Sequence, residues 1–136
     1  MAALARAGQH GLIWHGLAAA GALLDGRRRS VYQRAARVTL AAYGANQALK
    51  FVVRRRRPRL EGLPPLAATS TDLSFPSAHA TTSFAAARAL DGALPSPLLH
   101  ATAVAMALSR PYLGVHYPSD VFAGAALGHA LARALP

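Results

Sequence analysis

Three short blocks of this 136-residue sequence carry side chains that could do chemistry together. The first runs from Lys50 to Arg57 and is followed by Pro58. Lys50 lies in an apolar segment, where a charge is costly and usually functional; the alternative is a lysine whose ammonium group reaches the membrane surface. If this segment is helical, seven residues are about two turns, and both cations project from one face ~10 Å apart. We expect the intervening Arg54–Arg56 to lie at a membrane interface or to contact anionic lipid headgroups.

The second block is Pro76-Ser77-Ala78-His79, at the expected start of a helix. Ser77 is a good N-cap residue, and the free backbone N–H groups at a helix start form an anion site. A phosphate could accept hydrogen bonds from the first three amides, starting at Ser77, and from the Ser77 hydroxyl. His79 could then supply a proton. Taken alone, the block would more simply be a capped helix with a histidine.

The third block begins with Ser109 and Arg110 and ends with His116 and Asp120. A spacing of four residues lets the Asp120 carboxylate reach one imidazole nitrogen of His116 and fix its tautomer. The other nitrogen is then left as a nucleophile or base. Arg110 offers a planar guanidinium suited to phosphate oxygens. Taken alone, the His–Asp pair could merely cap a helix.

Together the blocks supply three cations, two histidines, one orienting carboxylate and a helix N-terminus. Phosphoryl transfer needs this set, because equatorial charge must be neutralised and the leaving oxygen needs a proton donor. The five acidic residues form no cluster that could hold magnesium. The chain has no cysteine, which excludes disulfides and thiolate metal sites. We therefore expect phosphoryl chemistry without a metal or cofactor.

The elements that must position these blocks are uncharged runs, separated by arginines or by Pro and Gly turns. No strand-like alternation and no internal repeat is visible, which predicts an all-α fold in a single domain, residues 1–136. The second helix should stop near Arg56, because the residue before a proline is biased out of helical geometry. The expected helices span roughly residues 9–24, 31–56, 77–90, 96–110 and 119–134.

The composition indicates a membrane protein. Hydrophobic residues make up 53% of the chain although its formal net charge is +10, a combination that suits a membrane protein with basic loops. Most uncharged runs fall short of the ~20 residues of a transmembrane helix, but flanking arginines with long stems would lengthen them. The pair Gly124 and Gly128 would favour close helix–helix contact in lipid, or is a local packing accident. We predict a transmembrane bundle of about five helices, with the catalytic residues at helix ends on one membrane face.

The orientation in the membrane depends on two basic loops. Arg27–Arg29 suggest a cytoplasmic loop, which puts the catalytic ends on the extracytoplasmic face. The basic segment Arg54–Arg59 favours the opposite orientation. We expect a multi-pass cell-membrane protein with an extracytoplasmic active site.

With these residues assembled, the sequence closely resembles the type 2 phosphatidic acid phosphatase family. The family pattern is K-x6-R-P, then P-S-G-H, then S-R-x5-H-x3-D, and this chain departs from it at Ala78, where glycine is usual. Alanine should be tolerated if its φ is helical, because the backbone N–H is the useful group there. The sequences of residues 73–81 and 113–120 are similar to those of the decaprenylphosphoryl-5-phosphoribose phosphatase subgroup. The family usually has six transmembrane helices, so an N-terminal helix would be missing here.

The resemblance implies a role for each matched residue. His116 attacks phosphorus, Asp120 orients and charges it, and His79 protonates the leaving alkoxide and then activates the water that hydrolyses the phosphohistidine. The residues expected to hold the phosphate are Lys50, Arg57, Ser77, Ala78 and Arg110. The substrate would be a phosphomonoester or diphosphate of a lipid or polyprenyl carrier, such as decaprenylphosphoryl-5-phosphoribose. Its headgroup pocket would draw on residues 59–75.

Several alternatives remain open. Undecaprenyl diphosphate and phosphatidylglycerophosphate are other candidate substrates. A vanadate-dependent haloperoxidase shares the three blocks, but such proteins are large and soluble. A non-enzymatic basic membrane or nucleic-acid-binding protein would explain the charge but not the spacing, and the basic runs lack the aromatic residues that stack on bases. The expected partners are therefore a lipid phosphate and membrane lipids, without nucleic acid.

Overall fold

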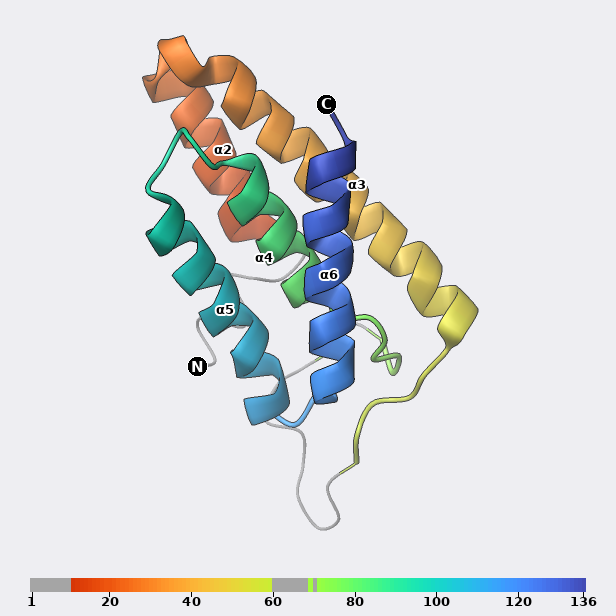
Figure 1. Ribbon diagram of the computed structural model, residues 1–136. Helices are drawn as coiled ribbons and strands as arrows, with labels where there is room; N and C mark the ends of the chain where they lie inside the picture. The colour runs from red at the N-terminus through yellow and green to blue at the C-terminus, as the bar shows by residue number, and fades with distance from the viewer. Residues whose placement is uncertain (1–10, 60–68, 70) are drawn as a thin grey trace.

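The computed structural model describes residues 11–59, 69 and 71–136 (Figure 1). Its helices are α2 (Leu12–Leu24), α3 (Arg29–Val53), α4 (Ala78–Ala89), α5 (Ser96–Tyr112) and α6 (Pro118–Ala134), with a 3₁₀ turn, η2 (Gly26–Arg28), after α2. All five predicted helices are present, and the described residues hold only isolated β-bridges. The all-α prediction is confirmed.

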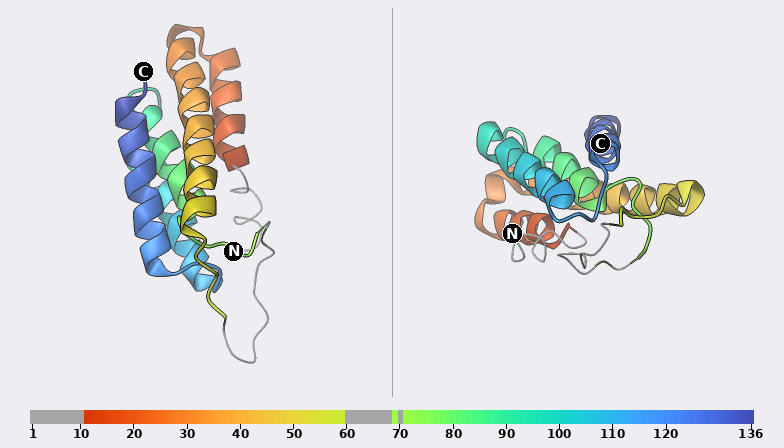
Figure 2. Two further views of the ribbon diagram at one scale, coloured as in Figure 1. Left: turned by 90° about the vertical axis from the view of Figure 1, so that its right-hand side faces the viewer. Right: turned by 90° about the horizontal axis from the view of Figure 1, so that it is seen from below.

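Helix α4 lies at the centre of the bundle and packs against α3, α5 and α6 (Figure 2). Most of its residues are buried, and nearly all of them are Ala, Thr or Ser. Because small side chains let helix backbones approach closely, three helices can pack around this one. The buried hydroxyls of Thr81 and Thr82 bond to carbonyls one turn back, Ser77 O at 3.0 Å and Ala78 O at 2.9 Å. The core therefore holds polar groups without leaving these hydroxyls unsatisfied.

Helices α4 and α6 approach each other closely at Gly124 and Gly128. A Cβ added at Gly124 would lie 2.6 Å from the carbonyl oxygen of Ser77, and one added at Gly128 would overlap the carbonyl oxygen of Thr81. No side chain fits there, so both positions require glycine. The glycine pair predicted to mediate helix contact does so within this chain, and it fixes α6 against the start of α4.

The end of α3 differs from the sequence prediction. The helix stops at Val53, because Arg54 adopts a left-handed conformation with φ 54° and its N–H closes the last turn on Lys50 O. The chain then runs extended, and Arg56 pairs with Leu73 in an antiparallel bridge. The prediction that this helix continues to Arg56 was therefore wrong. The prediction that Lys50 and Arg57 share one helix face was also wrong.

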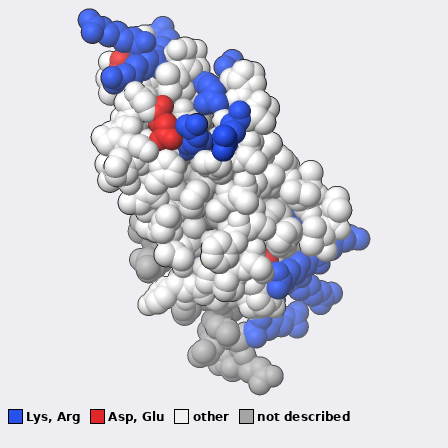
Figure 3. All heavy atoms as spheres, in the orientation of Figure 1, with Lys and Arg blue, Asp and Glu red and all other residues white. Residues whose placement is uncertain are grey.

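The surface carries basic ends and an uncharged middle. Figure 3 shows Lys and Arg gathered at the α2–α3 corner and beyond the end of α3, with uncharged side chains between them. None of the helices in the described part of the chain is both long and apolar enough to cross a membrane. Large apolar side chains nevertheless stand exposed on several helices: Leu24, Leu40, Phe51, Val52, Leu98, Leu108 and Phe122. The membrane-spanning arrangement stays a prediction.

Candidate active site

The three sequence blocks meet at one end of the bundle, where the C-terminal ends of α3 and α5 lie near the N-terminal ends of α4 and α6 (Figure 1). Lys50 Nζ bonds to Pro76 O at 3.1 Å, which joins the first block to the second. The Ser77 amide donates to Asp120 O at 2.9 Å, which joins the second to the third. A chain contact thus links each block to the next.

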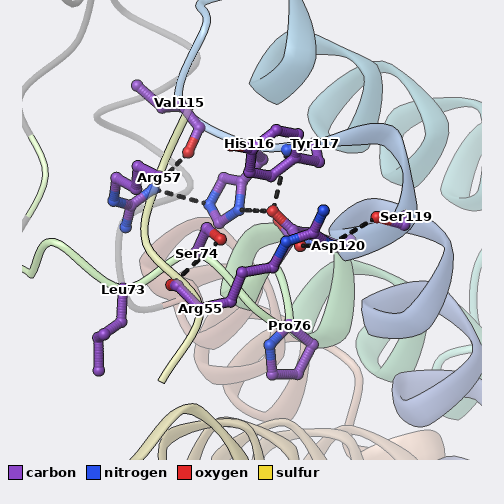
Figure 4. Close-up of polar contacts among 12 residues, drawn as sticks. Arg55, Arg57, Leu73, Ser74, Pro76, Val115, His116, Tyr117, Ser119 and Asp120 are labelled. Atoms are coloured by element: carbon purple, nitrogen blue, oxygen red, sulfur yellow. Dashed lines mark hydrogen bonds and ion pairs between the residues drawn. The ribbon is translucent and has the colours of Figure 1, made fainter. Parts of the chain in front are cut away.

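His116 and Asp120 form a buried pair at the start of α6 (Figure 4). Asp120 Oδ2 accepts the Tyr117 amide at 2.9 Å, which caps the helix and fixes the carboxylate. His116 Nδ1 lies 3.5 Å from the same oxygen, at the outer limit of a hydrogen bond. Catalytic hydrogen bonds are often long before substrate binds and tighten later. The expected His–Asp pairing is therefore present in geometry.

The contact of Arg57 with His116 selects the imidazole tautomer. Arg57 Nη1 lies 3.1 Å from His116 Nε2. A guanidinium can only donate, so Nε2 must carry the lone pair and Nδ1 the proton. The proton-bearing nitrogen faces Asp120, and the unprotonated nitrogen faces the Arg57 cation. Arg57 is held there by bonds to Thr71 O and Val115 O, both at 2.8 Å.

The electrostatic environment keeps this imidazole neutral. The pKa of His116 is lowered from 6.5 to about 4: burial is the largest cause, the contact with Asp120 acts in the opposite direction, and the Arg57, Lys50 and Arg110 cations add to the lowering. At neutral pH Nε2 therefore keeps its lone pair. A neutral, buried imidazole surrounded by cations is suited to attack an anionic electrophile.

Arg110 is a buried cation whose hydrogen bonds are incomplete. Its Nε and Nη1 atoms are buried and have no hydrogen-bond partner in the described part of the chain. Leaving the donors of a buried guanidinium unpaired is expensive, and charged groups cost the most. The unpaired donors point to an anionic ligand at this end of the bundle, and a phosphate offers the matching acceptors.

The start of α4 provides the helix N-terminus that the sequence predicted. Ser77 is the N-cap and its hydroxyl accepts from Ala80 N at 3.5 Å. Its own amide donates to Asp120 O, so the prediction that this amide binds phosphate was wrong. Ala78 begins the helix, so its backbone is helical as tolerance of alanine required. The amides of Ala78 and His79 lie in the first turn, where no helical carbonyl is available to them. The half-buried side chain of His79 projects from this turn.

Lys50 is buried, and its ammonium group faces the backbone before α4. It donates to the carbonyls of Leu73, Ser74 and Pro76 at 3.1–3.5 Å. Asn46, one turn earlier on α3, donates to the same Pro76 O and to Thr81 Oγ1. Lys50 therefore supports the segment that leads into the helix N-terminus, and direct contact with phosphate stays a prediction.

A cavity of about 750 Å³ lies beside this cluster. Its walls include four arginines and also Asp72, and the full lining is Arg54, Arg56, Arg57, Pro58, Arg59, Thr69, Asp72, Leu73, Gly114 and Val115. Part of this wall belongs to the segment 59–75 expected to form the headgroup pocket; residues 60–68 and 70 lie outside the described residues. Within the described residues, no three His, Asp or Glu side chains group as metal ligands do.

Arg55, expected from the sequence at a membrane interface, instead contacts the start of α6. Arg55 Nη1 lies 3.1 Å from Asp120 Oδ1 and donates to Ser119 Oγ at 2.8 Å, and its guanidinium stacks 4.1 Å from the Tyr117 ring centroid (Figure 4). A run of four arginines gives no signal of which one turns inward. The backbone is extended after Arg54, and side chains two residues apart in an extended segment share a face. Arg55 and Arg57 therefore both turn toward the site.

Comparison with known proteins agrees with this geometry. The family model of the PAP2 superfamily matches residues 34–136. The chain is 42% identical over 125 residues to decaprenylphosphoryl-5-phosphoribose phosphatase of Mycobacterium tuberculosis, which covers 92% of this chain and 71% of that protein. It is 43% identical over 124 residues to the protein of the same name from Mycolicibacterium smegmatis, covering 90% and 68%. Its fold is similar to the transmembrane PAP2 type phosphatidylglycerolphosphate phosphatase from Bacillus subtilis, with TM-score 0.56, 26% identity, and 90% and 72% of the two chains covered.

Proposed function

The chain belongs to the PAP2 superfamily and is a lipid-phosphate phosphatase, and from this premise we propose that it hydrolyses a polyprenyl-linked phosphomonoester through a phosphohistidine. One observation carries the mechanism. His116 is buried with its unprotonated Nε2 facing the Arg57 cation and its Nδ1 facing a carboxylate. A histidine in this state is a nucleophile and does not need a base to become one.

In the first step, His116 Nε2 attacks phosphorus and the bond between phosphorus and the ester oxygen breaks. His79 gives its proton to that oxygen, so the carrier leaves as an alcohol. The phosphorylated imidazole is cationic, and its Nδ1–H donates to Asp120, whose negative charge stabilises it.

In the second step, His79 takes a proton from water as the water oxygen attacks phosphorus. The P–N bond breaks, its electron pair returns to His116 Nε2, and orthophosphate leaves. The enzyme regains its starting protonation state, with the proton back on His79. Neither step requires a metal ion, and the sequence offers no acidic cluster to bind one.

The phosphate oxygens are held by cations and amides around His116. The unpaired donors of Arg110 and the first-turn amides of Ala78 and His79 supply hydrogen bonds, and the Ser77 hydroxyl adds another. The Arg57 guanidinium, now against Nε2, shifts onto a phosphate oxygen when phosphorus occupies that position. Lys50 contributes positive charge to the site while it supports residues 73–76.

The substrate we propose is decaprenylphosphoryl-5-phosphoribose, which the names of the mycobacterial relatives carry. The cavity beside the site is large enough for a sugar headgroup and is rich in arginine. The carrier would lie in the membrane, in which the chain is embedded as a multi-pass protein with its active site on the extracytoplasmic face. The exposed apolar side chains and the uncharged surface between the basic ends support that placement.

A screen of phosphate release in detergent and EDTA tests the proposal. The panel contains decaprenylphosphoryl-5-phosphoribose, undecaprenyl diphosphate, phosphatidylglycerophosphate and phosphatidic acid. We expect the first compound to have the highest kcat/KM, and rapid quenching to trap an acid-labile, base-stable phosphoprotein. Preference for a glycerolipid would contradict the substrate, and activity that returns only on adding magnesium would contradict the mechanism.

A second candidate substrate is phosphatidylglycerophosphate. It is favoured by the fold similarity to the Bacillus subtilis phosphatase named for that lipid. The lower sequence identity to that protein makes it the weaker candidate, and the same screen separates the two.

A further inference from the structure

We propose that Arg55 is a positioning residue for the nucleophile: it holds the Asp120 carboxylate so that one oxygen stays directed at His116. The inference rests on the proposed phosphohistidine mechanism and adds a residue outside the family pattern, which specifies Lys50 and Arg57 in this block but not Arg55. Nothing in the catalytic steps above uses it.

The two carboxylate oxygens of Asp120 have separate partners. Oδ2 accepts the Tyr117 amide at 2.9 Å and lies 3.5 Å from His116 Nδ1. Oδ1 lies 3.1 Å from Arg55 Nη1. With each oxygen tied to a different group, the carboxylate cannot rotate about its χ2 axis without losing a hydrogen bond. Its orientation toward His116 is thereby fixed.

Arg55 is itself held more firmly than an ordinary surface arginine. Its side chain is 39% exposed, yet Nη1 also donates to Ser119 Oγ at 2.8 Å and the guanidinium stacks 4.1 Å from the centre of the Tyr117 ring. An arginine that makes both a stacking contact and directional hydrogen bonds loses its freedom to leave the carboxylate. These contacts are with Ser119 and Tyr117, which lie near Asp120 in sequence at the start of α6. Arg55 is therefore held against the same helix end that carries the carboxylate.

The side of the imidazole on which Arg55 lies determines which kinetic step it affects. Arg57 reaches Nε2, where phosphorus binds, whereas Arg55 reaches the carboxylate behind Nδ1. Arg55 also does not line the substrate cavity. Its loss should therefore weaken stabilisation of the cationic phosphohistidine and leave substrate binding intact. Arg55 and Arg57 share one face of the extended segment, but Arg57 lies on the Nε2 side of the His116 ring and Arg55 on the Nδ1 side, behind Asp120.

The test is a mutant cycle with Arg55→Gln, Asp120→Asn and the double variant, assayed in detergent by phosphohistidine formation in a single turnover and by steady-state kcat and KM. We expect Arg55→Gln to lower both the phosphorylation rate and kcat about 10- to 100-fold, the range for a lost charge-assisted hydrogen bond. KM should change less than about twofold, because Arg55 does not line the substrate cavity. In the Asp120→Asn background the same substitution should have almost no further effect, because its target is gone.

Two further variants control the experiment. Arg55→Lys should recover part of the rate, because lysine keeps the positive charge but lacks the planar guanidinium that stacks on Tyr117 and donates in a fixed geometry. Arg88→Gln removes another arginine–aspartate ion pair of 3.1 Å, at the opposite end of the bundle, and should leave kcat and KM unchanged. Thermal unfolding of Arg55→Gln checks that a loss of rate is not a loss of fold.

Several outcomes would overturn the inference. A raised KM with unchanged kcat would make Arg55 a substrate contact, and an undiminished effect in the Asp120→Asn background would show that it acts elsewhere. Normal kinetics for Arg55→Gln would remove any role. If Asp120→Asn is too slow to assay, the split between kcat and KM for Arg55→Gln alone decides. Failure of the proposed function looks different, because the wild type would then form no phosphohistidine.

Discussion

Among the described residues, two histidine–aspartate pairs lie at opposite ends of the bundle. At the catalytic end, His116 Nδ1 is 3.5 Å from Asp120 Oδ2, and the two side chains are 3% and 0% exposed. At the far end, His100 Nδ1 is 3.8 Å from Asp91 Oδ1, and the side chains are 35% and 24% exposed. The separations are similar, so distance does not distinguish a reactive pair from a structural one.

The difference lies in what the other groups of each pair contact. At the far end, His100 Nδ1 donates to Ser96 O at 3.0 Å, and Asp91 is paired with Arg88. Those bonds stay within α5 and around the turn between α4 and α5, among groups that remain close to water. At the catalytic end, the second ring nitrogen faces Arg57, and buried Arg110 donors lie nearby unpaired. His116 differs from His100 because its second ring nitrogen faces a cation beside the unpaired donors of Arg110, and for that reason we propose it as the nucleophile.

The largest expected effect comes from removing the two histidines in turn. His116→Ala should abolish covalent phosphorylation, because it removes the nitrogen that we propose attacks phosphorus. His100→Ala, at the matched far pair, should retain phosphorylation and turnover. Rapid quenching followed by detection of acid-labile phosphate measures both. Labelled phosphate on the His116→Ala protein would reassign the nucleophile, with His79 as the first candidate.

His79→Ala should have the next largest effect, and it depends on the leaving group. Turnover of lipid substrates should fall roughly 10²- to 10⁴-fold, the loss expected when general acid catalysis alone is removed. Nitrophenyl phosphate needs little protonation of its leaving oxygen, so its hydrolysis should fall much less. Comparing kcat for the two substrate types measures this. An equal loss on both would assign His79 to phosphate binding.

Arg110→Gln should lower kcat roughly 10²- to 10³-fold, as loss of a preorganised donor to transition-state charge does in other enzymes. Vanadate mimics the phosphoryl transition state, so we expect it to inhibit the wild type and to raise its Tm, and Arg110→Gln should lose both responses. Arg88→Gln, which removes a paired arginine of the far end, should keep both responses. Thermal unfolding with and without vanadate measures the binding separately from the chemistry. Retained vanadate protection in Arg110→Gln would place the anion elsewhere.

The smallest expected effect is on stability against pH. Folding holds the pKa of His116 at about 4 rather than 6.5, so between these pH values the unfolded chain binds a proton that the folded chain does not. Stability from this group is therefore lost as pH falls from 6.5 toward 4. His116→Gln should lose less stability than the wild type over that window in denaturant titrations. An identical loss would show that His116 is protonated normally in the fold.

Helix positions were predictable from the sequence because the signals are local. Pro118 marks the first turn of α6 and Ser77 the N-cap of α4, and both helices begin where those residues indicate. The catalytic blocks could be found from spacing because His116 and Asp120 lie on one turn. Contacts between side chains a few residues apart at one helix end can therefore be predicted from the sequence.

Contacts made across the fold could not be predicted in that way. Arg54 through Arg57 are chemically identical, and only the left-handed turn at Arg54 and the pairing with Leu73 decide which arginine faces Asp120. The same applies to Lys50, whose ammonium group meets backbone carbonyls more than 20 residues away in sequence. Such contacts depend on chain reversal by the segment between α3 and α4, for which the sequence offers few distinctive side chains.

The hydrogen bond from the Ser77 amide to the Asp120 carbonyl joins the anion-binding start of α4 to the first turn of α6, and Gly124 and Gly128 extend that contact along both helices. This arrangement constrains how the enzyme can diversify. A substitution between α4 and α6 would displace the proposed phosphate site and the partner of the proposed nucleophile together, so we expect few substitutions to be tolerated there. The cavity wall at Thr69 lies outside this contact. Substrate range can therefore change through that wall, by natural drift or by design, while the reaction stays the same.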